Sequence, residues 1–109
     1  MKNQDKEYSL EQIRTAQVEI ARVMGIEGLN GYEMLSLEKA TLVLRNLERL
    51  MMSAMEKSLI ASLKEEAKAL KTVVEEMTDT AKRLFRLTNL LKGIVKITGR
   101  VIDILVLLK

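Results

Sequence analysis

The sequence predicts an all-α protein, an elongated three-helix bundle of coiled-coil type that associates with further copies of itself. Small or apolar residues recur at alternating steps of three and four from Leu63 to Leu105, and this 3.5-residue period is typical of a coiled-coil seam. The 109 residues include no proline and only five glycines, so residues that end helices are rare. Aromatic residues make up only 3%, which predicts an aliphatic core.

The first helix is expected over residues 9–24. Residues 1–8 are polar and are expected to fray. Ser9 through Gln12 form the pattern of a capping box, with Ser9 as the N-cap. The helix should end at Gly25, because the three glycines within 25–31 permit the backbone conformations of a loop. Residues 9–109 therefore form a single helical domain with one clear loop, over 25–31.

The second helix is expected over residues 36–77, with Ser36 as its N-cap. Its apolar positions again alternate in steps of three and four, but the phase drifts near Met55 and Leu59. We interpret this drift as a stutter, at which a coiled coil locally unwinds.

The third helix is expected over residues 79–108, after a bend at 78–80. The residues there, Thr78, Asp79 and Thr80, favour caps over helix interiors. The alternative is one continuous helix from about Ser36 to the end of the chain, since the heptad phase crosses this point undisturbed. We favour the bend, because the first helix would then fill the remaining length of the second.

The heptad seam is the predicted interface between copies, because long, thin helical layouts bury little surface per residue and a monomer would be marginal. Thr88 and Thr98 within the seam can each bond a carbonyl four residues back. The expected partner is therefore the protein itself, as a homo-oligomer. The predicted interface residues are Leu63, Leu70, Val74, Met77, Leu84, Leu91, Val95, Ile102 and Leu105.

The net charge of +3 is distributed unequally along the chain. Residues 80–109 carry seven basic groups and one acidic group, whereas residues 1–79 are net acidic. At 100° per residue, five of the basic groups fall on one face of the third helix: Lys82, Arg86, Lys92, Lys96 and Arg100. Such a face is the solvated side of a bundle helix, a contact to an anionic membrane surface, or a contact to nucleic-acid phosphates.

Composition argues against most chemistry. The chain has no cysteine and no histidine, which excludes disulfides, thiolate or imidazole metal sites and Ser-His relays. The acidic cluster at Glu75, Glu76 and Asp79 is typical of a solvated helix face. The glycines of 25–31 lack the Gly-Lys-Ser/Thr of a phosphate-binding loop. We therefore expect no enzyme activity, cofactor, metal or small-molecule substrate.

Location is predicted from the absence of two sequence signals. The N-terminus has no apolar signal-peptide segment, and no window of 18 residues is free of charge. We expect a cytoplasmic protein. The alternative is a protein bound peripherally to a membrane. Residues 104–108 are apolar on every side of a helix, and we expect an oligomer or lipid to cover them.

A short run resembles a helical motif of phage and mobile-element DNA-transaction proteins. In those proteins a Gly-Ile loop precedes a helix that opens with Leu-Ser/Thr-x-Glu-x-Ala, and here Gly25-Ile26 precedes Met34-Leu35-Ser36-Leu37-Glu38-Lys39-Ala40. The run covers under a quarter of the chain, and any capped amphipathic helix would share it, so it identifies no family.

Three functions follow from these patterns. The leading hypothesis is a non-enzymatic structural or adaptor protein that self-assembles through the heptad seam. The first alternative is a membrane-active protein that uses a basic amphipathic C-terminal helix. The second alternative is a phosphate-contacting nucleic-acid accessory protein of phage or mobile-element type, to which the short resemblance also points.

Overall fold

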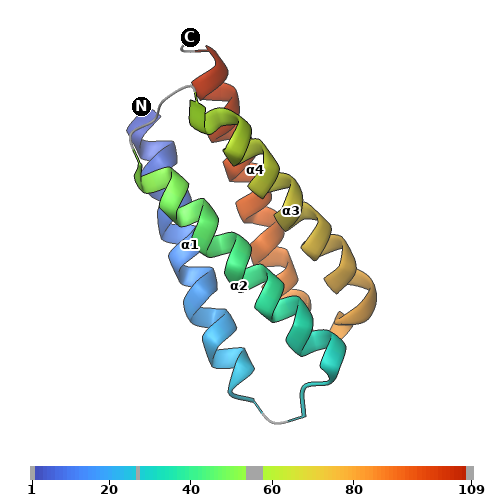
Figure 1. The fold of residues 1–109 in the computed structure, drawn as a ribbon. Coiled ribbons are helices and arrows are strands. Elements are labelled where there is room, and N and C mark those ends of the chain that lie inside the picture. The colour runs from blue at the N-terminus through green and yellow to red at the C-terminus, as the bar shows by residue number, and fades with distance from the viewer. Residues whose placement is uncertain (1, 27, 54–57, 108–109) are drawn as a thin grey trace.

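The computed structural model describes residues 2–26, 28–53 and 58–107, with side chains from Lys6 onward within these ranges, except that of Ser58. These residues form an antiparallel four-helix bundle with extents of 47 × 20 × 18 Å (Figure 1). The all-α prediction is confirmed, but the described residues form four long helices where three were expected. The helices are α1 (Lys2–Met24), α2 (Gly31–Met52), α3 (Ser58–Thr80) and α4 (Phe85–Leu107), and a 3₁₀ turn, η1 (Lys82–Leu84), precedes α4.

The helices pack as a closed ring. Each one contacts two neighbours, in the order α1, α2, α3, α4 and back to α1. Within the described residues, the backbones of α2 and α4 do not approach each other, so these two helices occupy diagonal corners. Consecutive helices run in opposite directions, and the start of α1 therefore lies at the same end of the bundle as the end of α4 (Figure 1).

Helix α1 begins earlier than predicted. It starts at Lys2, and residues 2–8 are helical where fraying was expected. Ser9 is not an N-cap but a buried residue inside the helix, 1% exposed. It lies one turn before Ile13 on the core side of α1, and no helix-breaking residue precedes it, so the helix continues toward the N-terminus.

Helix α2 also begins earlier than predicted, at Gly31 rather than after Ser36. Asn30 is its N-cap: the Asn30 side chain accepts a hydrogen bond from the Glu33 backbone N–H, and the Glu33 carboxylate accepts one from the Asn30 backbone N–H. This reciprocal capping box satisfies two backbone donors that would otherwise be unpaired. Gly28, just before it, has a φ of +90°, which glycine adopts without strain. Ser36 is buried inside the helix.

The predicted helix over 36–77 is two helices. Helix α2 ends at Met52, and Ser53 is its C-cap, where both the backbone N–H and the hydroxyl of Ser53 donate to the Arg49 carbonyl oxygen. The Ser53 hydroxyl thus competes with backbone N–H groups for the Arg49 carbonyl oxygen, which weakens the helix at this point. The drift in apolar phase marks this boundary rather than a stutter in one helix. Met55 lies outside the described residues, and Leu59 lies in the first turn of α3.

The bend expected at 78–80 lies just after these residues. Helix α3 continues to Thr80, and Ala81 leaves helical geometry with φ −133° and ψ 51°. The described backbone therefore excludes one continuous helix from Ser36 to the end. The third predicted helix, 79–108, is replaced by η1 and α4, which begins at Phe85.

The heptad seam is buried inside one chain. Three of the nine predicted interface residues, Leu84, Val95 and Leu105, are half-buried and pack against the core. Because α3 and α4 contact each other directly, the 3.5-residue period pairs these two helices within one chain, and the interface between copies stays a prediction. The other six residues are buried in this core: Leu63, Leu70, Val74, Met77, Leu91 and Ile102.

Two seam threonines behave differently. The Thr88 hydroxyl donates to the Leu84 carbonyl oxygen at 3.1 Å, as expected from their spacing. Among the residues that the structure describes, the buried hydroxyls of Thr98 and Ser9 have no hydrogen-bond partner. Beyond the core, Val106 and Leu107 are exposed at the end of α4, so one chain alone does not cover these two residues of the apolar C-terminal segment.

Candidate functional site on the outward face of α4

Five basic side chains follow the outward side of α4. Lys82 extends from η1, and all five side chains are exposed. At 100° per residue they occupy about a third of the helix circumference, and at 1.5 Å per residue the row is about 27 Å long. We call this row the basic face. Its members are Lys82, Arg86, Lys92, Lys96 and Arg100.

The opposite side of α4 is occupied by the core. Leu91 and Thr98 are fully buried, and Ile94 is 1% exposed. A helix that lies in a membrane surface inserts its apolar side into the lipid. In the closed bundle this side of α4 is covered by the other helices, so the outward, basic side is the one available for binding.

Two small hollows lie between α3 and α4 beside the basic face. Lys82 and Lys92 border one of about 120 Å³, which Phe85 also lines. Lys71 and Glu75 of α3 and Lys92 of α4 border a second, of about 260 Å³. The two lysines of the first hollow, whose lining has no carboxylate, can hold a phosphate or carboxylate by charge, whereas Glu75 offsets one of the two positive charges at the second. Lys71 has no signal in the sequence as a member of this site, because only the register between α3 and α4 places it beside Lys92.

The helices on either side of α4 carry acidic groups. On α3, five acidic residues outnumber three lysines, and Glu65, Glu75 and Asp79 are exposed. On α1, Glu7 and Glu11 are exposed. Helix α3 is thus net acidic and α1 carries equal numbers of acidic and basic residues, whereas η1 and α4 together are net basic.

Arg83, next to Lys82, does not belong to the basic face but forms an ion pair within the bundle. Its guanidinium donates two hydrogen bonds of 2.6 Å to the Glu33 carboxylate, and it also donates to the Gly28 carbonyl oxygen. The Arg83 guanidinium and the Asn30 backbone N–H hold the pKa of Glu33 down, to about 2. The Arg83–Glu33 pair was not predicted from the sequence, although the spacing Asn30-x-x-Glu33 signals the capping box to which Glu33 belongs.

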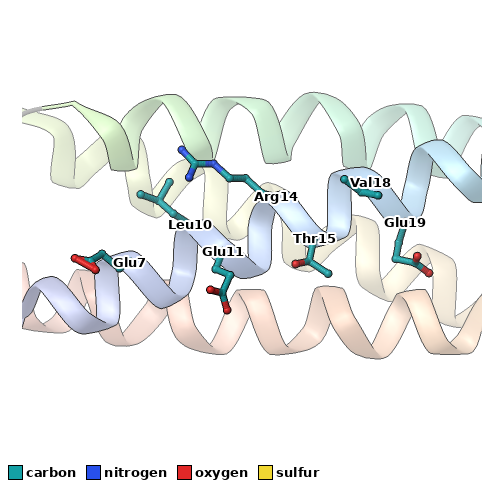
Figure 2. A pocket seen from close by; sticks show the side chains of 7 residues that line it. All are labelled: Glu7, Leu10, Glu11, Arg14, Thr15, Val18 and Glu19. Atoms are coloured by element: carbon teal, nitrogen blue, oxygen red, sulfur yellow. The ribbon is translucent and has the colours of Figure 1, made fainter.

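Another hollow, of about 500 Å³, lies on the surface of α1. Figure 2 shows that Arg14 points toward α2, while Glu11 and Thr15 lie on the other side of α1. The Arg14 guanidinium donates to the Glu48 carboxylate at 2.8 Å, and this contact, aided by Gln17, lowers the pKa of Glu48. The Arg14 side chain therefore serves packing between α1 and α2, and side chains of one helix alone line the hollow.

Two further features of the described residues bear on chemistry and on membranes. No group of three or more acidic side chains there is arranged to hold a metal ion. Within the same residues, no helix combines the length and apolarity that crossing a membrane requires.

Comparison with known proteins gives no relative: no family model, no curated protein and no solved structure matches this chain.

Proposed function

We propose that this protein is a non-enzymatic binding protein that docks through the basic face of α4 onto the phosphate backbone of a double-stranded nucleic acid. The observation that carries the proposal is the exposed row of five cations along a helix whose apolar side is buried. Contacts of this kind neutralise phosphates and release counterions, and they carry no base sequence information.

The shape of the basic face favours a duplex over a membrane. A membrane is flat, so contact along α4 would also bring the acidic groups of α3 and α1 toward the lipid headgroups. A duplex is a convex rod that can follow the basic face and curve away from the neighbouring helices. The exposed apolar residues of α4, Phe85, Val106 and Leu107, lie at its two ends, and the apolar side between them is buried. Membrane binding would therefore lack a continuous apolar insertion along the helix.

Direct reading of bases is not expected. Most base contacts come from a helix or ribbon that enters the major groove, whereas α4 is flanked by α3 and α1. Besides the basic residues, α4 exposes Asn89 and Gly93, the apolar Phe85, Val106 and Leu107 near its ends, and Asp103 one turn beyond Arg100. We therefore expect similar affinity for duplexes of unrelated sequence.

Binding to a short fluorescent duplex tests the proposal. If five phosphates are neutralised, raising the salt from about 50 to 200 mM should weaken binding about 500-fold. The double substitution Lys92→Gln and Lys96→Gln should weaken binding and reduce the salt dependence by about two counterions. The matched control, Arg45→Gln with Arg49→Gln, removes the same charge from the diagonal helix α2 and should bind like the parent.

Vesicles that contain anionic lipid provide the competing measurement. The proposal expects duplex binding at low salt without co-sedimentation of the protein with the vesicles. Co-sedimentation with the vesicles without duplex binding would contradict the proposal and show that the protein binds anionic membranes instead. Equal loss of duplex binding in the α4 and α2 double variants would show a response to net charge alone and would contradict the assignment of the basic face.

A further inference from the structure

We propose that the outward face of α2 binds a second copy of this chain, so that two α2 helices pack antiparallel. Leu35 and Leu42 lie seven residues apart on this face and are 49% and 60% exposed. A seven-residue spacing places two side chains on the same side of a helix. They form a short apolar stripe in the middle of a helix whose other exposed apolar residues, Tyr32 and Met52, lie at its two ends.

Two unpaired charges of opposite sign accompany the stripe. Glu38 and Arg45 are exposed, and neither forms an ion pair within the part of the chain that the structure describes. They too are seven residues apart, and at 100° per residue both lie on the side of the stripe that faces α1. Arg49, one turn further along, is also exposed.

This pattern is complementary to itself. In an antiparallel pair related by a two-fold axis, side chains on one side of the stripe meet side chains on the same side of the second helix. An axis beside Leu42 places this leucine against Leu42 of the second copy. It also places Glu38 against Arg45 of the second copy and the reverse, giving two ion pairs. Leu35 then lies against the aliphatic part of Arg49.

The parallel arrangement would not form these ion pairs. In a parallel pair related by a two-fold axis along the helices, the side of the stripe that carries Glu38 and Arg45 meets the opposite side of the second stripe, where Lys39 already pairs with Glu76. The antiparallel pair alone brings Glu38 of one copy to Arg45 of the other, and this self-complementary charge identifies the partner as a second copy of the chain.

The size of the surface predicts a weak dimer. The stripe from Leu35 to Arg49 is about 21 Å long on a helix about 10–12 Å wide. It offers roughly 200–250 Å² per copy, against the approximately 800 Å² per partner of a standard stable interface. We therefore expect association only at high micromolar to millimolar concentration. Because α2 and α4 are diagonal, the pair would leave both basic faces exposed.

Sedimentation equilibrium over about 10 μM to 1 mM, a range suited to weak dimers, tests the proposal with charge reversals on α2. Glu38→Arg should create two repulsive contacts and abolish association, and so should Arg45→Glu. An equimolar mixture of the two single variants restores opposite charges at both contacts, and the double variant does the same within one chain. Both are expected to associate like the parent. The matched control is Glu65→Arg on α3, which makes the same charge change elsewhere and should leave association unchanged.

Several outcomes would overturn the proposal. A parent protein that remains monomeric throughout the range would do so. Single variants that associate as strongly as the parent, or a mixture that fails to regain association, would show that these charges do not meet. Association lost equally in Glu65→Arg would show a response to net charge. Duplex binding by the basic face does not enter this test, so the two proposals can fail separately.

Discussion

The Arg83–Glu33 ion pair joins the turn between α3 and α4 to the start of α2, at one end of the bundle, although fifty residues separate the two in the sequence. Arg83 Nε lies 2.6 Å from Glu33 Oε2, and Nη2 lies 2.6 Å from Oε1. The Glu33 side chain is 3% exposed, and it also accepts the Asn30 backbone N–H. One carboxylate therefore completes the N-cap of α2 and fixes the turn between α3 and α4.

The first prediction concerns the pH dependence of stability. The folded pKa of Glu33 is about 2, below the value of about 4.3 expected in the unfolded chain. A depressed pKa means that the ionised group stabilises the fold above the unfolded pKa, and this contribution is lost as the pH falls from about 4.3 toward 2. Glu33→Gln should lower the free energy of unfolding at pH 7. It should also make this free energy fall less between pH 7 and the acid range below about 4.3. Denaturant unfolding at pH 7 and in that acid range measures both effects.

A surface ion pair supplies the control for Glu33→Gln. Glu19 pairs with Arg22 one turn away, and the Arg22 hydrogen bond lowers the pKa of Glu19. Both side chains are exposed, where ion pairs contribute little to stability. Glu19→Gln should therefore change the unfolding free energy far less than Glu33→Gln. Equal effects of the two substitutions would contradict the structural role of the Arg83–Glu33 pair.

The sequence predicted the fold class because periodicity is a local property. The stripe through Leu63, Leu70 and Met77 required a facing helix, and the structure supplies one. The pattern does not state whether that helix belongs to the same chain or to another copy. The turn at Ala81, which folds α4 back against α3, decides this. The residues around it include neither glycine nor proline, so the turn gives only a weak signal in the sequence.

The candidate site was predictable to the extent that it lies on one helix. The positions of Arg86, Lys92 and Lys96 follow from 100° per residue alone. Lys71 joins them through the register of α3 against α4, and Arg83 meets Glu33 only because two distant loops share an end of the bundle. Such relations between elements have no local signature.

The second prediction tests whether the heptad seam packs within one chain or between two copies of the chain. Leu70 is fully buried, so Leu70→Ala should cost about 2–5 kcal/mol of unfolding free energy. Leu42→Ala removes the same atoms from an exposed site and should change the value by no more than about 0.5 kcal/mol. Chemical denaturation followed by circular dichroism measures both. A Leu70→Ala protein that unfolds like the parent but loses mass in light scattering would show that the seam joins copies.

A third prediction concerns the unpartnered hydroxyl of Thr98. Valine has nearly the same shape and lacks the buried hydroxyl, which has no hydrogen-bond partner. Thr98→Val should therefore stabilise the protein by about 1 kcal/mol. Thr88→Val is the control, because the Thr88 hydroxyl donates to the Leu84 carbonyl oxygen, and it should gain less. A loss of stability in Thr98→Val would show that its hydroxyl bonds to a group such as a buried water.

The last prediction compares two glycines that differ in backbone conformation and share open surroundings. A Cβ added at Gly93 or at Gly28 meets no atom within 4 Å. Gly93 lies inside α4, so Gly93→Ala should stabilise the protein by about 1 kcal/mol through helix propensity. Gly28 has a φ of +90°, so Gly28→Ala should destabilise it by about 1–2 kcal/mol. Thermal and denaturant unfolding of both variants measure the difference. Equal effects would contradict either the helix through residue 93 or the left-handed backbone at residue 28, and amide hydrogen exchange across α4 would identify which.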